Sequence, residues 1–146
     1  MARVTIKRPV TVKVIVTETF KAAMLASLEE SINEIDLQLK QMEFQAKRFL
    51  ADLEKQSPQQ VISARSQIES EREKRREARE RLLAEAQEVA KWEIGQEVTQ
   101  GVVEGLVDIG IGDDLRKIMA TEIIVKDGIV AEIREGNIPE ADGEGG

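Results

Sequence analysis

The densest group of residues with chemical potential is an arginine-rich stretch between Arg65 and Arg81. Guanidinium groups bind phosphate through paired hydrogen bonds, so this stretch is a candidate contact for RNA. Glutamates such as Glu69 and Glu73 are interspersed at helical pairing distance, and aromatic residues that stack on bases are missing nearby. A helix face whose charges pair with each other is therefore the favoured interpretation. The alternative is nucleic-acid contact, with these candidate residues: Arg72, Arg75, Arg76 and Arg79.

A second candidate is a group of aspartates, Asp108, Asp113 and Asp114, in a segment that also contains glycine. Carboxylates in a loop suit a divalent cation or acid–base chemistry. The loop lacks the spaced oxygen ligands and the distal glutamate of an EF-hand, and Gly110–Gly112 lacks the lysine of a phosphate loop. Turn-forming aspartates are the favoured interpretation. We predict no catalytic or metal site and no cofactor.

The composition removes several classes of enzyme chemistry. The 146 residues include no histidine, cysteine or tyrosine, so imidazole catalysis, thiol nucleophiles and the usual zinc ligands are missing. A formal net charge of -7 disfavours nonspecific binding to nucleic acid or anionic lipid. No stretch approaches the roughly 18 apolar residues of a membrane span, and residues 1–8 do not read as a secretory signal. We expect a non-enzymatic, cytoplasmic protein with no membrane contact and no small-molecule substrate.

The middle of the chain begins with a heptad pattern that predicts one long helix. Apolar residues recur in steps of three and four from Leu25 to Leu53, which is the spacing of a coiled-coil seam. Thr17 or Thr19 can cap the start through its hydroxyl group. We predict a helix from about Glu18 to Lys55, on the order of 55 Å long.

A second helix is predicted directly after a turn at residues 56–59. The turn contains serine followed by proline, which is typical of a helix start, and a second seam runs from Val61 to Trp92. So short a connection requires an antiparallel hairpin. The hairpin brings Leu25 near Val89. Two polar residues interrupt the second seam: Glu71 and Arg75.

The N-terminal segment has the two-residue period of a β-strand. Six even positions between Val4 and Val16 are valine or isoleucine, whereas Thr5, Lys7, Thr11 and Lys13 point the other way. Proline cannot donate a ladder hydrogen bond, so we expect Pro9 to divide the segment or to lie at an edge or bulge.

The C-terminal segment also predicts strands. Apolar residues of Val98–Ile111 change parity partway along, which predicts a bulge or bend near Leu106. Residues 121–133 form two β-rich runs separated by Asp127 and Gly128, the pair that a type I′ hairpin turn favours.

Together these patterns predict an α+β fold. A long antiparallel coiled-coil hairpin, residues 18–95, is expected as an insertion into a small antiparallel β-sheet or barrel, because neither terminal segment forms an adequate sheet alone. Residues 1–17 would supply the N-terminal strands and residues 96–135 the C-terminal strands. Residues 136–146 are acidic and rich in glycine, and we expect them to be disordered.

The chain resembles the YlqD family of uncharacterised bacterial proteins. The resemblance lies in the strand VTVKVIVT at Val10–Thr17, the long charged helical middle, GDDL at Gly112–Leu115, and EIIVKDGIVAEIR at Glu122–Arg134. It covers most of the chain outside the glycine-rich end. No active-site residue comes with the resemblance.

A second row of apolar residues recurs every seven residues on the first helix, opposite its seam. The row is Leu37, Phe44 and Ala51, widened by Leu50, and the second helix cannot cover it. Scattered exposed apolar residues are normal on proteins; the alternative is a contact surface for a partner or a second copy. The leading hypothesis is an interaction or assembly protein that uses the hairpin for binding or self-association. RNA or ribosome binding by the β-domain and the arginine-rich helix is the alternative.

Overall fold

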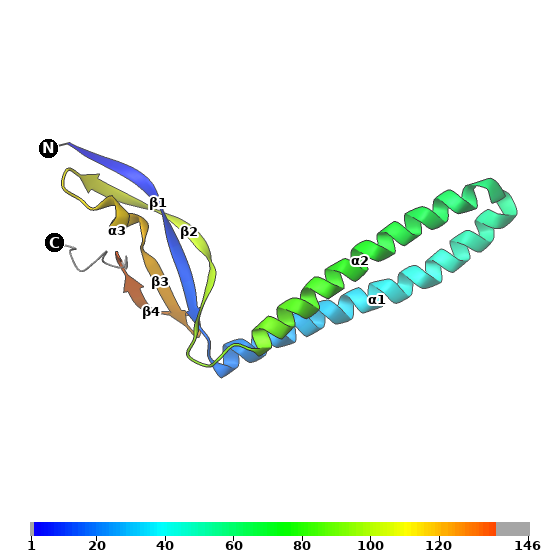
Figure 1. Cartoon of the computed structure of the whole chain (residues 1–146), viewed down its shortest axis with the longest axis horizontal. Coiled ribbons are helices and arrows are strands. Elements are labelled where there is room, and N and C mark those ends of the chain that lie inside the picture. Colours follow the sequence, from blue (N-terminus) through cyan, green and yellow to red (C-terminus); the bar gives the residue numbers. More distant parts are fainter. Residues whose placement is uncertain (1, 137–146) are drawn as a thin grey trace. The chain divides into compact units, whose positions relative to one another are not determined.

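The computed structural model describes residues 2–136, which form two compact units. One unit comprises residues 2–20 and 93–136, and the other comprises residues 21–92. The α+β class is confirmed, with two long helices inserted between strands from the two ends of the chain (Figure 1). The expected disordered end, residues 136–146, lies outside the described residues apart from Gly136. The elements are β1 (Arg3–Ile15), α1 (Glu18–Gln56), η1 (Pro58–Gln60), α2 (Val61–Ala90), β2 (Glu97–Gly110), α3 (Leu115–Met119), β3 (Glu122–Lys126) and β4 (Ile129–Arg134).

The sheet has the strand order β2-β1-β3-β4 and is mixed rather than wholly antiparallel. β1 pairs antiparallel with β2, β3 pairs antiparallel with β4, and β1 runs parallel to β3. The connection from β2 to β3, which contains α3, crosses to the far side of β1 instead of turning back as a hairpin. The expectation of an antiparallel arrangement is corrected at this one pair. β2 and β4 are edge strands, so the sheet is open and not a barrel.

β1 is a single strand of 13 residues, and Pro9 does not divide it. Pro9 pairs with Glu104 of β2, whereas β3 pairs only with Thr11–Val14. Pro9 therefore has a neighbouring strand on one side only, where a missing N–H group is tolerated.

The ladder between β1 and β2 has its bulge at Gln100 and not near Leu106. The register shifts where Val12 faces Gly101 and Lys13 faces Thr99, which leaves Gln100 as the extra residue. The ladder continues without interruption through Leu106. Val102 and Leu106 are exposed, whereas Val107 and Ile109 are half-buried. The parity change in the sequence therefore reflects apolar residues on both faces of β2, and the prediction of a bulge or bend near Leu106 was wrong.

The core of the β-unit is small and aliphatic. Val10, Val14, Val16 and Ile124 are buried, and their burial provides most of the apolar stabilisation of a sheet this size. The tight turn between β3 and β4 has positive φ at both central residues, 49° at Asp127 and 80° at Gly128. The predicted type I′ turn is therefore confirmed.

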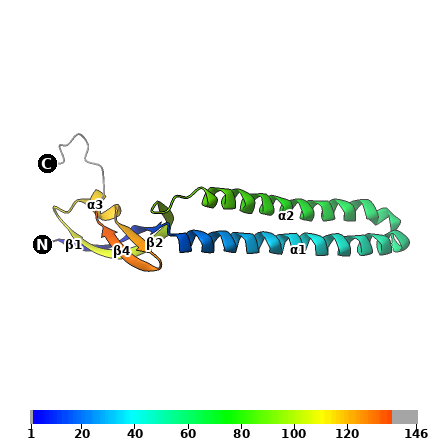
Figure 2. The same cartoon turned by 90° about the horizontal axis from the view of Figure 1, so that it is seen from below.

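The two long helices run side by side in both views (Figures 1 and 2). Thr17 caps α1, because its Oγ1 accepts a hydrogen bond of 3.0 Å from the Phe20 amide. Near this same end of α1, Lys21 Nζ donates a 2.9 Å hydrogen bond to the Trp92 carbonyl. The start of α1 thus lies beside the end of α2, in agreement with the expected antiparallel register.

Candidate functional site

The outer stripe of α1, defined as Leu37, Phe44 and Ala51, is exposed to solvent. Leu37 is 55% exposed and Phe44 is 64% exposed, although both are large apolar side chains. Leu50 is half-buried, so it lies on the flank of the helix and does not widen the stripe. The structure therefore brings three of the four predicted contact residues onto one exposed face.

A charged side chain borders the stripe at its largest member. The guanidinium of Arg48 lies 5.9 Å from the ring centroid of Phe44, within the range of a cation–π contact. Such a contact at an exposed site contributes about 0.5–1 kcal/mol and leaves the ring open to other partners. Phe44 is thus held in place beside an arginine and remains largely uncovered.

Two of the candidate arginines connect α2 to α1. Arg72 Nε lies 2.5 Å from Glu43 Oε1, and Arg79 Nε donates a 2.6 Å hydrogen bond to Asp36 Oδ1. This hydrogen bond is the main cause that raises the pKa of Arg79. The heptad pattern placed Glu71 in the seam, but Glu71 is exposed and the half-buried residue is its neighbour Arg72.

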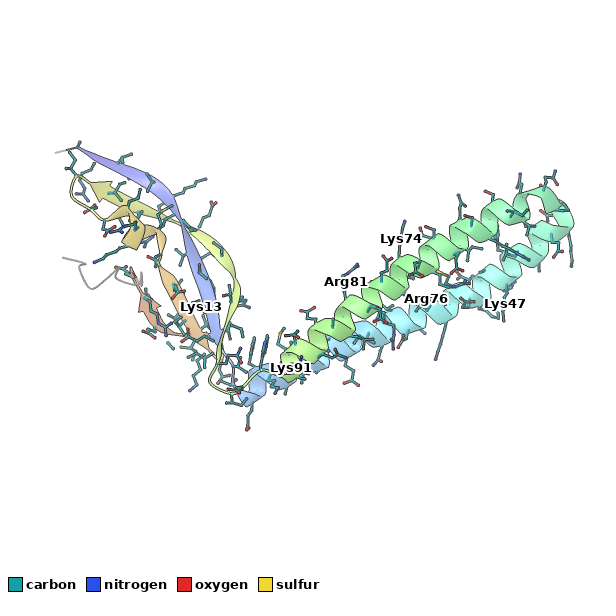
Figure 3. The ribbon with its side chains drawn as sticks, in the orientation of Figure 1. Lys13, Lys47, Lys74, Arg76, Arg81 and Lys91 are labelled. Carbon is teal, nitrogen blue, oxygen red and sulfur yellow. The ribbon has the colours of Figure 1, made fainter. Side chains whose placement is uncertain are left out.

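The other two candidate arginines pair within α2. Arg75 Nη1 lies 3.2 Å from Glu71 Oε2, and Arg76 Nη1 lies 3.8 Å from Glu69 Oε1. The pKa of Glu71 is lowered by its hydrogen bond with Lys74 and then by that with Arg75. Each candidate nucleic-acid residue is therefore engaged with a carboxylate. Figure 3 labels Arg76 together with Lys74 and Arg81 on α2 and Lys47 on α1.

The middle of the hairpin has an open groove on one side. It occurs where Arg75 faces α1 in place of an apolar residue, and Met42 and Phe49 contribute its apolar wall. Long, flexible side chains cover apolar surface with their stems while their charged ends reach water. The groove follows from this polar interruption of the seam.

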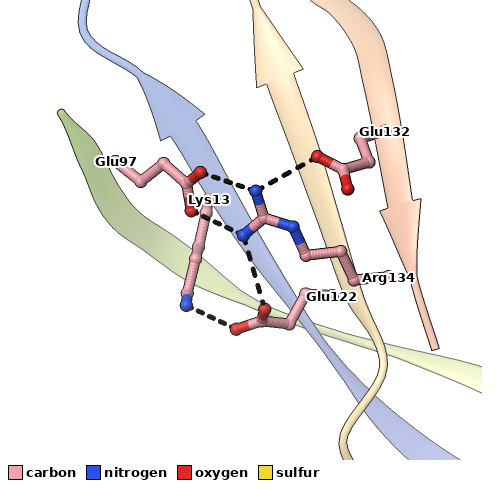
Figure 4. Close-up of polar contacts among 5 residues, drawn as sticks. All are labelled: Lys13, Glu97, Glu122, Glu132 and Arg134. Atoms are coloured by element: carbon pink, nitrogen blue, oxygen red, sulfur yellow. Dashed lines mark hydrogen bonds and ion pairs between the residues drawn. The ribbon is translucent and has the colours of Figure 1, made fainter. Parts of the chain in front are cut away.

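An ionic cluster on the sheet joins all four strands (Figure 4). Arg134 of β4 donates hydrogen bonds of 2.8 and 2.7 Å to the two carboxylate oxygens of Glu97 on β2, and one of 3.1 Å to Glu132. Glu122 of β3 lies 3.9 Å from Arg134 and 2.5 Å from Lys13 Nζ on β1. A bidentate arginine–carboxylate pair has both strength and a fixed orientation.

The cluster is suited to holding strands and not to proton transfer. The hydrogen bond from Arg134 is the main cause that lowers the pKa of Glu97, and the same pair raises the pKa of Arg134. Both groups therefore stay charged near neutral pH, whereas a general acid or base needs a pKa near the working pH. Sequence analysis missed this cluster because its members come from four separate strands.

The three aspartates have structural partners. Asp108 Oδ2 accepts a 3.0 Å hydrogen bond from Arg3, and Asp113 Oδ2 accepts one of 2.7 Å from the Gly110 amide. Asp114 caps α3 by accepting a 3.0 Å hydrogen bond from the amide two residues later. The contacts of Asp113 and Asp114 support the interpretation of turn and cap residues. Asp108 lies within β2, opposite Thr5 of β1, so the expectation of a turn residue was wrong for it. Across residues 2–136, no three His, Cys, Asp or Glu side chains are grouped so that they could hold a metal ion.

Within residues 2–136, no helix combines the length and the apolar character that crossing a bilayer requires.

Comparisons with known proteins agree with the resemblance seen in the sequence. The family model described as "YlqD protein" matches residues 4–134. The uncharacterized protein YlqD of Bacillus subtilis (strain 168) is 30% identical over 127 residues, which cover 86% of this chain and 94% of that protein. A crystal structure of a protein of unknown function from Synechococcus sp. WH 8102 superposes with a TM-score of 0.75 at 31% identity, covering 92% of this chain and 96% of the other. The chain therefore belongs to the YlqD family.

Proposed function

We propose that the protein is a non-enzymatic interaction or assembly module, in which the helical hairpin presents the outer stripe of α1 to a protein partner. The observation that supports it most is the exposure of Leu37 and Phe44, 55% and 64% respectively, one heptad apart on one helix face. Apolar residues aligned along an exposed helix face are the anchors used when one helix docks on another. Covering Phe44 alone would remove much of its ring surface from water, at about 25 cal/mol per Å².

The composition and the charged groups are consistent with this function. The chain has no histidine or cysteine. The paired charges of the β-unit, such as Arg134 with Glu97, bridge strands. The proposal therefore assigns the β-unit a scaffolding role and the hairpin the contact.

RNA or ribosome binding is the second candidate and has less support. Arg72, Arg75, Arg76 and Arg79 are each within 4 Å of a carboxylate, so phosphate would have to displace an existing partner. RNA binding would appear as an affinity that falls steeply with salt concentration.

Photo-crosslinking in the native cell tests the proposal. A photoreactive phenylalanine analogue at Phe44 should give a covalent adduct, because the site lies in the contact. The matched control places the same analogue at Glu73, which is an exposed position of α2, and should give none. Adding Leu37→Glu should strongly reduce the adduct at position 44. The mass of the adduct tells a second copy from another protein, and absence of any protein adduct at position 44 would refute the proposal.

A further inference from the structure

We infer that the partner of the outer stripe is a second copy of this chain, bound with the two α1 helices antiparallel around a two-fold axis at Gln41. This inference rests on the proposed function, since it identifies the occupant of the same surface. The argument for it comes from the charges that border the stripe.

One flank of the stripe carries a row of evenly spaced polar residues. Glu34 and Arg48 each lie seven residues from Gln41, so all three share one line along α1. All three are exposed, and the contact between Arg48 and the Phe44 ring places this line directly beside the stripe. The row is therefore acidic at one end, neutral in the middle and basic at the other.

Such a row is complementary to itself when it is reversed. In an antiparallel pair with a two-fold axis at Gln41, the same flank of each helix meets its counterpart, so Glu34 of one copy faces Arg48 of the other. The symmetry forms this pair twice. The same axis sets Leu37 of one copy beside Phe44 of the other, because these residues lie on opposite sides of Gln41. A parallel pair would instead place the two copies of this flank on opposite sides of the interface, so that Glu34 and Arg48 would not meet.

Both charged groups are available for such contacts. Within the described residues, neither Glu34 nor Arg48 has a carboxylate–cation partner at ion-pair distance, in contrast to Asp36 and Glu43, which α2 engages. Asp36 and Glu43 on the inner side of α1 thus form ion pairs with α2. Glu34 and Arg48, beside the stripe, form none within the described residues.

The opposite flank contains an unfavourable contact of this arrangement. Lys40 lies next to the two-fold axis, so the two copies of this exposed side chain approach each other. Long lysine stems let the two ammonium groups diverge into water, and Lys40→Gln should therefore strengthen the dimer by a small factor. The contact would extend over residues 30–51, about 33 Å of helix. An interface of this length buries an area at the small end of the range for protein interfaces. We expect association in the micromolar to millimolar range.

Sedimentation equilibrium tests the inference by measuring the dimerisation constant of the full chain and of a series of charge-reversal variants. Glu34→Arg and Arg48→Glu should each weaken dimerisation about threefold to tenfold, since each turns two attractive contacts into repulsive ones. The double variant, which restores both pairs with reversed polarity, should recover the wild-type constant to within about twofold. Charge reversals on α2, Glu73→Arg and Arg81→Glu, are matched controls and should leave the constant unchanged. Far-UV circular dichroism checks that each variant is folded.

Two outcomes would overturn the inference in different ways. A wild-type chain that stays monomeric up to millimolar concentration would exclude the second copy as the occupant. In that case, an adduct at position 44 with a different protein would leave the proposed function intact. A dimer that is insensitive to both single reversals would exclude the antiparallel arrangement of α1.

Discussion

Arg134, at the end of one edge strand, donates two hydrogen bonds to Glu97, at the start of the opposite edge strand. The Arg134 side chain is only 26% exposed, and its other partners include Glu122 of the intervening β3. A four-stranded sheet with few buried side chains has little other packing to hold its edges together. Arg134 therefore holds the two edge strands together across the sheet.

Replacing Arg134 should destabilise the β-unit. Arg134→Gln removes the bidentate pair and leaves Glu97, Glu122 and Glu132 close together with fewer cations. We expect the melting temperature to fall by on the order of 5 °C. The matched control is Arg116→Gln, because Arg116 is exposed and its ion pair is local, with Asp114. Thermal unfolding followed by circular dichroism makes the comparison. Equal melting temperatures for the two variants would show that Arg134 does not hold the edge strands together.

The Glu97 carboxylate should make stability depend on pH in the acidic range. Its pKa in the folded protein lies below the ordinary 4.5, chiefly through the hydrogen bond with Arg134. The ionised form therefore adds stability above the pKa of the unfolded chain, and this contribution is lost as the pH falls through the folded pKa. Wild type should exceed Glu97→Gln in stability near pH 7, and the difference should shrink towards about pH 3. Urea unfolding across this range measures it; a difference independent of pH would show that charge is not the cause.

The buried hydroxyl of Thr121 should stabilise the crossover between β2 and β3. Thr121 Oγ1 accepts a 3.1 Å hydrogen bond from Arg8 and donates one of 3.2 Å to the Ile118 carbonyl. Thr121→Val keeps the shape but removes both bonds, so we expect a loss of about 1–2 kcal/mol in the free energy of unfolding. Thr5→Val, at an exposed position of β1, should change it by less than about 0.5 kcal/mol. Similar losses for the two variants in urea unfolding would argue against this role.

Two leucines of α1 should differ sharply in their effect on stability. Leu28 is 7% exposed, whereas Leu37 on the outer stripe is 55% exposed. Leu28→Ala should lower the free energy of unfolding by about 2 kcal/mol or more, and Leu37→Ala by less than about 0.5 kcal/mol. Urea denaturation followed by the helical circular dichroism signal measures both. A large loss for Leu37→Ala would mean that this residue packs within the monomer and is not reserved for a partner.

Features set by local periodicity could be predicted from the sequence. The bounds of α1 and the turn at Asp127 and Gly128 follow from spacing and backbone preference, which act between near neighbours. The apolar alternation around Val10–Val16 likewise identified the buried face of β1, where Val10 and Val14 are buried, as is Val16 directly after the strand. The outer stripe was visible for the same reason, because its residues are one heptad apart.

Features that depend on distant segments could not be predicted in this way. The bulge at Gln100 is defined by the register against β1, and the parallel pairing of β3 by the path of the crossover. A partial signal existed for the ion pairs of the hairpin, since Asp36 and Glu43 are one heptad apart, as are Arg72 and Arg79. Which arginine pairs with which carboxylate becomes visible only when the two helices are packed against each other.

Fluorine NMR measures the occupancy of the outer stripe most directly. The chain has three phenylalanines, Phe20, Phe44 and Phe49, so fluorophenylalanine labelling gives three resonances, and Phe44→Leu assigns one of them. We predict that the Phe44 resonance shifts and broadens in an extract of the native cell, or as the protein is concentrated, while the Phe20 resonance does not. The Leu37→Glu substitution should abolish this change in the Phe44 resonance. A Phe44 resonance that stays the same as in dilute buffer under all these conditions would contradict the account.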